Sequence, residues 1–249
     1  MLDGVDDINL TNNLSLTSFL SANEIHIWSA CLPENEKNLY YFISILSKDE
    51  RLKANNFKYI KDQKNFIISR GILRCLLGKY LKEEPQAIEI LYGLWGKPCL
   101  AEPLLYFNLS HSKDYVLYAL TCACEVGIDL EYIDNTLDIE NIALSILTPY
   151  ELDYWRNVKS EDRIHTFFEF WVCKEAFLKA SGKGWLNDQI AIPLESVGAI
   201  EGNTIRTTLN KKITLPYCFD AIPGYVSALF IDGPFLHPLY YTWDPLPKE

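Results

Sequence analysis

Apolar and polar positions alternate with two different periods along the chain, which predicts a mixture of strands and helices. Ile25 to Ala30 alternates with a period of two residues, as a half-buried strand does. From about Asp62 the apolar residues follow a helical stripe that stops before Pro85. Three segments separated by turn residues have the composition of strands, namely residues 88–92, 105–109 and 115–121.

The second half of the chain follows the same order of strand, helices and strands. Residues 126–133 alternate like a strand, and Thr148, Pro149 and Glu151 form the start of a helix, with Thr148 as the N-cap. A longer helix is expected from about Ser160 to Gly182. Later strands are predicted at residues 213–215 and 225–231.

These patterns predict an α+β fold made of two similar halves in a pseudo-twofold arrangement. Each half is expected to pack a long helix on a small antiparallel sheet. We expect the boundary between residues 1–124 and residues 125–249. A cleft between the halves is the natural place for a ligand.

Composition and charge narrow the class of protein. The chain has 249 residues, of which 49% are hydrophobic and 22% charged, as in an ordinary globular protein. Its formal net charge of −10 argues against a general nucleic-acid binder. The N-terminus lacks the features of a signal peptide, no apolar run is long enough to span a membrane, and the seven cysteines contain no CxxC. These features predict a cytoplasmic protein with reduced thiols. The first dozen residues of the chain are polar and are expected to form a loose tail.

Two carboxylates, Asp129 and Glu131, lie two residues apart in the predicted strand 126–133. Both should leave the same face of the strand, roughly 7 Å apart, while Ile128 and Leu130 occupy the opposite face. A solvent-facing edge strand would give the same pattern. Converging carboxylates are also what a hard divalent cation requires.

A third carboxylate, Glu175, lies on the predicted long helix at helical spacing from Ile164, Phe168 and Trp171. An acidic residue on a face that enters the core needs a cation or a metal beside it. Lys179 lies one turn further along the same face. The alternative is an ordinary glutamate–lysine pair on a solvated helix edge.

Ser110 and His111 directly follow a predicted strand. Because adjacent strand residues point apart, the two are poorly placed to act as a nucleophile and its base. Their polar groups are better suited to holding a phosphate, although a role in stabilising the turn is equally compatible with their position.

Taken together, the ordered motifs resemble those of the 4′-phosphopantetheinyl transferase superfamily. They are residues 96–98 (GKP), 107–112 (FNLSHS), 126–131 (VGIDLE), 170–176 (FWVCKEA) and 179–184 (KASGKG). The length and the two-half plan resemble the large, monomeric, surfactin-type class. The resemblance covers roughly residues 47–184.

The resemblance implies a metal site and a coenzyme A site. Asp129, Glu131 and Glu175 would bind Mg²⁺, for which Mn²⁺ is a possible substitute, and the ion would bridge the pyrophosphate of coenzyme A. The residues expected to contact coenzyme A are Arg51, Lys53, Lys64, Lys97, Ser110, His111, Lys174 and Lys179. Asn65 stands where the family often carries an arginine, which puts the contacts to adenine and the 3′-phosphate in doubt.

The implied reaction moves the phosphopantetheine arm from coenzyme A to a serine of an apo acyl or peptidyl carrier protein, releasing adenosine 3′,5′-bisphosphate. Glu175 and Lys179 would act in catalysis. Glu151 matches the suggested general base, and its other interpretation is a helix-capping residue. The carrier would serve fatty-acid, polyketide or nonribosomal peptide synthesis, and Phe57 and Trp185 are candidate docking positions.

Two other functions remain open from the sequence alone. One is a metal-dependent nucleotide phosphohydrolase, and the other is a non-catalytic module that binds coenzyme A or a carrier. The Ser-His and Gly-Lys-Pro segments disfavour the first, and the retained carboxylates and Lys179 disfavour the second. Neither a nucleic acid nor a membrane is expected as a partner.

Overall fold

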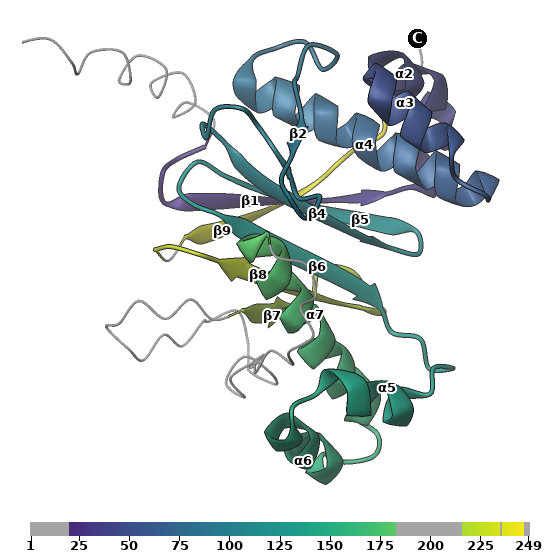
Figure 1. Cartoon of the computed structure of the whole chain (residues 1–249), viewed down its shortest axis with the longest axis vertical. Coiled ribbons are helices and arrows are strands. Elements are labelled where there is room, and N and C mark those ends of the chain that lie inside the picture. Colours follow the sequence, from purple (N-terminus) through teal and green to yellow (C-terminus); the bar gives the residue numbers. More distant parts are fainter. Residues whose placement is uncertain (1–19, 183–215, 235, 247–249) are drawn as a thin grey trace, which may run out of the picture.

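The computed structural model of the chain describes residues 20–182, 216–234 and 236–246, and shows two larger sheets with helices on their outer sides, together with a two-stranded sheet formed by a hairpin (Figure 1). The elements of the first group are β1 (Glu24–Cys31), the 3₁₀ helix η1 (Pro33–Asn38), α2 (Leu39–Ile45), α3 (Lys48–Asn55), α4 (Ile60–Leu81), β2 (Leu91–Tyr92), β3 (Pro98–Cys99), β4 (Tyr106–Ser112) and β5 (Tyr115–Thr121). Those of the second group are β6 (Val126–Tyr132), α5 (Ile139–Ile146), α6 (Pro149–Asn157), α7 (Arg163–Ser181), β7 (Tyr217–Phe219), β8 (Tyr225–Ile231) and β9 (His237–Thr242).

The first sheet has the strand order β4-β5-β1-β9. Strands β4, β5 and β1 pair antiparallel, whereas β9 pairs parallel with β1. Residues 237–242 lie in the sequence range expected for the second half, yet they extend the sheet of the first. Helices α2, α3 and α4 cover one face of this sheet (Figure 1), and the buried residues Phe42, Leu73 and Tyr118 belong to the core between them.

The second sheet has the order β6-β8-β7, with both pairs antiparallel. Strand alternation gives it two apolar faces. Ile128 and Leu229 face the first sheet and pack with Ile27 and Leu117, whereas Val226, Ala228 and Phe230 share a core with the long helix α7. The layers are therefore helices, sheet, sheet and helix.

Helix α7 approaches β6 so closely at Gly127 that no side chain fits. A Cβ atom built on Gly127 would lie 1.9 Å from the carbonyl oxygen of Ala176 and 2.5 Å from the backbone nitrogen of Ala180. Both atoms belong to the helix backbone, so they cannot rotate away as a flexible side chain would. The absence of a side chain at residue 127 therefore sets how close the strand and the helix lie.

The structure confirms the predicted α+β fold class and most predicted elements. Helix α7 ends at Gly182, which has φ +62°, and α6 begins with the expected capping box between Thr148 and Glu151. The strand predicted at residues 88–92 is shorter, because only Leu91 and Tyr92 pair. The polar tail, the strand at residues 213–215 and Trp185 fall outside the described residues.

Two predictions about burial need correction. Strand β6 does lie at the edge of its sheet, but the solvent-facing alternative is wrong for Asp129, which is buried. On α7 the stripe through Glu175 is only partly buried, since Ile164 and Trp171 are intermediate, whereas the neighbouring Lys174 is fully buried. In the part of the chain that is described, no helix is long and apolar enough to cross a membrane.

Gly127→Ala should destabilise the protein strongly, because the new methyl group would have to displace the backbone of α7. We expect a loss of about 3 kcal/mol or more in the free energy of unfolding, measured by urea denaturation. Gly93→Ala is the matched control, since its Cβ would meet only the Lys97 carbonyl oxygen at 3.7 Å. It should cost less than about 1 kcal/mol. Equal losses in the two variants would contradict the close-packing account.

Candidate active site

Strands β4 and β6 lie side by side where the two sheets meet, and polar side chains of β4 bind β6. Ser110 Oγ donates to Asp129 Oδ1 at 2.8 Å, and Ser112 Oγ donates to Glu131 Oε2 at 2.8 Å. Asn108 Oδ1 accepts a hydrogen bond of 3.0 Å from a backbone N–H of β6. Because alternate residues of a strand share a face, these three β4 residues form one polar row against the acidic strand.

Asp129 is the most enclosed carboxylate of the site, with 2% of its surface exposed. Lys179 Nζ donates to Asp129 Oδ1 at 2.6 Å and to Ser110 Oγ at 2.8 Å. Asp129 Oδ2 is buried and has no hydrogen-bond partner among the described residues. A buried carboxylate oxygen without a partner is costly, so this oxygen has the capacity to bind a further cation.

Glu131 lies in a field of negative charge. Burial and the charges of Asp129 and Glu175 together raise its pKa to about 7, against the lowering effects of the hydrogen bond from Ser112 and the charge of Lys179. Three carboxylates therefore act on one another at the junction of β6 and α7. A divalent cation would offset this accumulated charge.

The residues present fit a divalent cation chemically, although the carboxylates are not already gathered around one point. Within residues 20–182, 216–234 and 236–246, no three His, Cys, Asp or Glu side chains form a ready-made metal cluster. The unpartnered oxygen of Asp129 and the raised pKa of Glu131 both favour a cation.

A pocket of about 240 Å³ lies next to these carboxylates, between the turn after β2 and helix α7. It is lined by residues of the predicted site and by their neighbours, which are Trp95, Gly96, Lys97, Pro98, Asn108, Leu109, Glu175, Leu178, Lys179 and Gly182. Lys97 Nζ is held there by the carbonyl oxygens of Val126, at 3.2 Å, and Ala180, at 2.8 Å, and also by Glu125. The Gly-Lys-Pro motif and α7 thus meet at one pocket.

Ser110 and His111 point to opposite sides of β4, as expected for adjacent strand residues. Ser110 is buried against Asp129, whereas His111 is exposed. The two side chains therefore do not form a catalytic dyad. Ser110 belongs to the polar row at the carboxylates.

Glu151 and Lys174 form a buried ion pair that does not line this pocket. Lys174 Nζ lies 2.8 and 3.1 Å from the two carboxylate oxygens of Glu151, and the side chains are 0% and 1% exposed, respectively. Burial lowers the pKa of Lys174, while the carboxylate of Glu151 opposes that shift. Glu151 also accepts a 2.7 Å hydrogen bond from the N–H of Thr148. The pair therefore ties α6 to α7.

The remaining predicted coenzyme A contacts lie on α3 and α4, away from the pocket lining. Lys53 is exposed, and its ammonium lies over the rings of Phe66 and Tyr92. Arg51 donates to the Leu46 carbonyl oxygen at 2.6 Å, and Lys64 pairs with Glu36 at 2.6 Å. Asn65 donates to the Lys113 carbonyl oxygen at 3.4 Å.

The sequence reasoning assigned no separate role to Asn108, Ser112 or Trp95, which the structure places at the site. Asn108, Ser110 and Ser112 occupy every second position of β4 and therefore share one face. This period of two among polar residues is the sequence signal that could have predicted their place at the site. Trp95, which precedes the Gly-Lys-Pro motif, lines the pocket while 57% of its surface stays exposed. An aromatic residue in a turn gives no such signal by itself.

Comparisons with known proteins place the chain among relatives of one family. Residues 28–123 match the family described as 4′-phosphopantetheinyl transferase, N-terminal, and residues 125–226 match the 4′-phosphopantetheinyl transferase superfamily. The 4′-phosphopantetheinyl transferase HetI of Nostoc sp. is 40% identical over 176 residues, covering 69% of this chain and 73% of that protein. The transferase Sfp of Bacillus subtilis is 27% identical over 200 residues, covering 80% and 81%. The transferase gsp of Aneurinibacillus migulanus is 28% identical over 180 residues, covering 72% of each.

Lys174→Met should destabilise the protein by about 3–5 kcal/mol, because it leaves the carboxylate of Glu151 buried without its cation. Glu151→Gln keeps the capping geometry, since glutamine also serves at that position, but leaves the lysine charge buried. The double variant should cost less than the sum of the single changes, and urea denaturation of all three measures this coupling. Lys159→Met, at an exposed position, is the control and should change little. Strictly additive losses would show that the two charges do not depend on each other.

Proposed function

Because this chain belongs to the 4′-phosphopantetheinyl transferase superfamily, we propose that it moves the phosphopantetheine arm of coenzyme A to a serine of an apo acyl or peptidyl carrier protein. The serine oxygen forms a bond to the phosphorus that carries the pantetheine. The bond from that phosphorus to the bridging pyrophosphate oxygen breaks, and adenosine 3′,5′-bisphosphate leaves. The serine proton is taken up by the departing bisphosphate, directly or by way of a base.

One observation carries the proposal: Lys179, which lines the pocket together with Lys97, is bonded to Asp129, whose other carboxylate oxygen has no partner among the described residues. A pyrophosphate needs cations on several sides, and its hydrolysable bridge needs charge neutralisation as it breaks. Lys97 and Lys179 supply two of these positive charges. The carboxylates could hold a metal ion that supplies the rest. A simple surface ion pair would need neither the burial nor the pocket.

Asp129, Glu131 and Glu175 are the residues that would hold Mg²⁺, with Mn²⁺ as a substitute. Asp129 would bind through Oδ2, which has no partner among the described residues, while Oδ1 keeps its bonds to Ser110 and Lys179. When bound, the cation offsets the charge of the pyrophosphate and stabilises the departing phosphate. Glu131, whose pKa is raised to about 7 by burial and by the neighbouring carboxylates, would be driven into its ionised form beside a cation.

The two lysines act on the phosphates from different elements. Lys179 extends from α7 and is fixed by Ser110 and Asp129, so its remaining donor capacity faces the pocket. Lys97 extends from the turn before β3 and is tethered to carbonyl oxygens at 2.8 and 3.2 Å and to the half-exposed carboxylate of Glu125. Both ammonium groups can therefore offset charge on the transferred group.

Glu151 remains the proposed general base, but its surroundings favour a positioning role over contact with the substrate. It is 1% exposed and is held by Lys174 and by the N–H of Thr148. A group so engaged does not reach the serine hydroxyl, so its role would be to position α7, which carries Lys174 next to Glu175. Glu151 is thus connected to the proposed metal ligand Glu175 through Lys174 and helix α7.

A monomer acting in the cytoplasm is part of the proposal. All seven cysteines lie in the described residues and none of them forms a disulfide, as expected where thiols stay reduced. The carrier is expected to be acidic, and meeting it from a chain with a net charge of −10 requires a locally basic or apolar contact.

The test is to incubate the protein with coenzyme A, Mg²⁺ and an apo carrier domain and to weigh the carrier by mass spectrometry. A mass gain of one phosphopantetheine arm, lost when the metal is chelated, is expected. An unchanged carrier with hydrolysed coenzyme A would favour a phosphohydrolase instead. Tight binding of coenzyme A with neither reaction would favour a non-catalytic module.

Glu175→Ala should lower kcat/KM for transfer by at least about a hundredfold while α7 stays folded, because it removes a metal ligand from a partly buried position. Circular dichroism checks the helix. Asp153→Ala, which removes an exposed carboxylate from α6, is the matched control and should keep full activity. Full activity in Glu175→Ala would remove Glu175 from the site.

A further inference from the structure

The hairpin formed by β2 and β3 carries Trp95 and Lys97 to the pocket, yet it has little support of its own. Its strands pair only at two positions, Leu91 with Cys99 and Tyr92 with Pro98. Leu94 is 92% exposed and Tyr92 46% exposed. A two-residue ladder with exposed side chains is marginal without outside contacts. Lys97 ties one end of the hairpin to β6 and α7, so further contacts are needed on the side of β2.

Direct packing against helix α3 does not supply that support. A cavity of about 420 Å³ separates the helix from β2, with Ser47, Glu50 and Lys53 on one side and Leu91 and Tyr92 on the other. Dispersion forces across such a gap are weak. Ile90 and Leu100, which flank the two strands, pack against the apolar core, and polar contacts add to this support.

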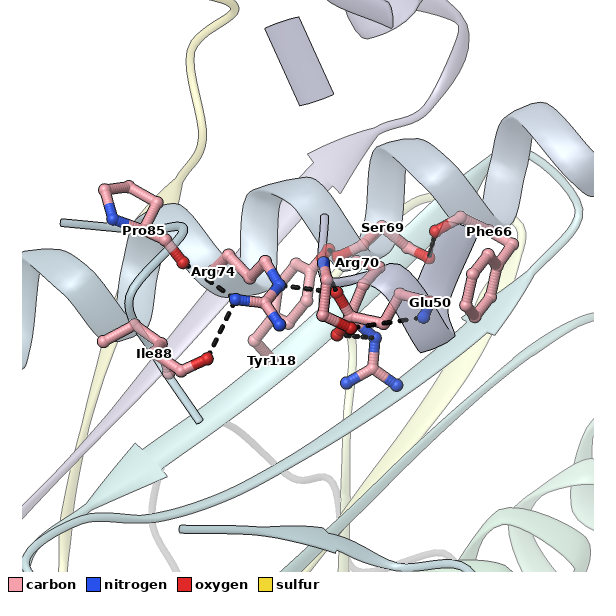
Figure 2. Close-up of polar contacts among 9 residues, drawn as sticks. Glu50, Phe66, Ser69, Arg70, Arg74, Pro85, Ile88 and Tyr118 are labelled. Carbon is pink, nitrogen blue, oxygen red and sulfur yellow. Dashed lines mark hydrogen bonds and ion pairs between the residues drawn. The ribbon is translucent and has the colours of Figure 1, made fainter. Parts of the chain in front are cut away.

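Arg74 of α4 anchors the segment that leads into the hairpin. Its guanidinium is 2% exposed, and Nη1 donates to the carbonyl oxygens of Pro85 and Ile88, both at 2.9 Å (Figure 2). Buried carbonyl groups outside regular structure need such donors. The rigid helix therefore fixes the backbone only three residues before Leu91.

Glu50 of α3 holds both arginines of this group. Its Oε2 accepts a 2.6 Å hydrogen bond from Arg74 Nε, and its Oε1 lies 3.6 Å from Arg70 Nε (Figure 2). The same carboxylate caps its own helix by accepting from the N–H of Ser47 at 2.8 Å. Removing either partner from such a buried group leaves an uncompensated charge.

Arg70 reaches the hairpin itself, through an aromatic ring. Its guanidinium carbon lies 5.7 Å from the ring centre of Tyr92, and the ammonium of Lys53 lies 5.9 Å from the same ring. Arg70 Nη1 is buried and has no hydrogen-bond partner among the described residues, so its remaining attraction is to the rings. Glu50 thus connects to the hairpin twice, through Arg74 at its root and through Arg70 at β2.

We propose that Glu50, Arg70 and Arg74 form a positioning network that holds the β2–β3 hairpin, and with it Lys97 and Trp95, in the arrangement that binds coenzyme A. The part of this inference that concerns coenzyme A rests on the proposed function. The part that concerns the position of the hairpin does not. None of the three residues needs to touch coenzyme A. Their loss should loosen the hairpin and weaken the binding of coenzyme A, leaving the carboxylates and α7 in place.

Arg74→Lys is the sharpest variant, because a lysine keeps a positive charge opposite Glu50 but cannot span two carbonyl oxygens and the carboxylate together. We expect KM for coenzyme A to rise about tenfold, while kcat and KM for the carrier stay within about twofold. A merely structural role would instead reduce the amount of active protein and leave KM unchanged. Arg163→Lys is the matched control, since Arg163 also binds two carbonyl oxygens, those of Arg156 and Val158, but far along the chain from the hairpin.

Hydrogen exchange of the free protein supplies a readout that does not depend on activity. The amides of Gly93 and Gly96 are bonded within the hairpin, to the carbonyl oxygens of Lys97 and Gly93, both at 2.9 Å. Both amides should exchange about tenfold faster in Arg74→Lys and at the normal rate in Arg163→Lys. If the wild-type protein transfers nothing, the proposed function fails, and this measurement still decides whether the network holds the hairpin.

Tyr92→Leu serves as the second variant if Arg74→Lys does not fold. It removes the ring that Arg70 and Lys53 contact from a half-exposed position, and KM for coenzyme A should rise a few-fold, about two- to fivefold. The proposal is overturned by unchanged hairpin exchange, by an unchanged KM for coenzyme A in an active variant, or by an equal rise in Arg163→Lys.

Discussion

The close approach of strand β6 to helix α7 at Gly127 is the contact on which the candidate site depends. With the strand backbone against the backbone of Ala176 and Ala180, the residues two and four positions beyond Gly127 on the same face lie under the helix. Those residues are Asp129 and Glu131. A side chain at position 127 would separate the two elements and move the strand carboxylates away from Glu175 and Lys179. Because no side chain fits at position 127, the charged residues of β6 and α7 come close together.

The polar row of β4 completes this arrangement from the other sheet. Carboxylates buried between a strand and a helix would be costly alone, and Ser110 and Ser112 offset part of that cost by donating to them. Lys179 offsets more at Asp129, but one oxygen of that group stays unpartnered and the pKa of Glu131 stays high. The negative charge of the carboxylates at the junction of the two sheets is therefore only partly offset by the described residues. Such imbalances mark sites that bind ions or ligands.

Most of the fold follows from residue patterns, because the core residues keep strict periods. The strands at residues 115–121 and 126–132 alternate between two buried faces, and the capping residues Thr148 and Gly182 mark helix ends. Sequence periodicity does not show which strands from distant segments pair, so the parallel addition of β9 to β1 was not foreseen. The division into residues 1–124 and 125–249 stays a prediction. The family and the fold class are confirmed.

The candidate site was only partly predicted, because sequence motifs do not show in which direction each side chain points. Asp129, Glu175, Lys179 and Lys97 belong to motifs, and the structure brings them to one place. Lys174 and Glu151 look like site residues by their order along the chain, yet burial turns them into a pair that joins two helices. Neighbouring residues of a helix point in different directions, so a single residue step separates a buried structural lysine from a carboxylate at the pocket. Sequence order alone does not convey that direction.

Crystals grown with coenzyme A and Mn²⁺, examined by anomalous scattering, would test the central claim most directly. The account predicts one manganese ion at bonding distance from carboxylate oxygens of Asp129, Glu131 and Glu175, and in contact with the pyrophosphate of coenzyme A. An ion bound elsewhere, or held only by water and the pyrophosphate, would contradict it.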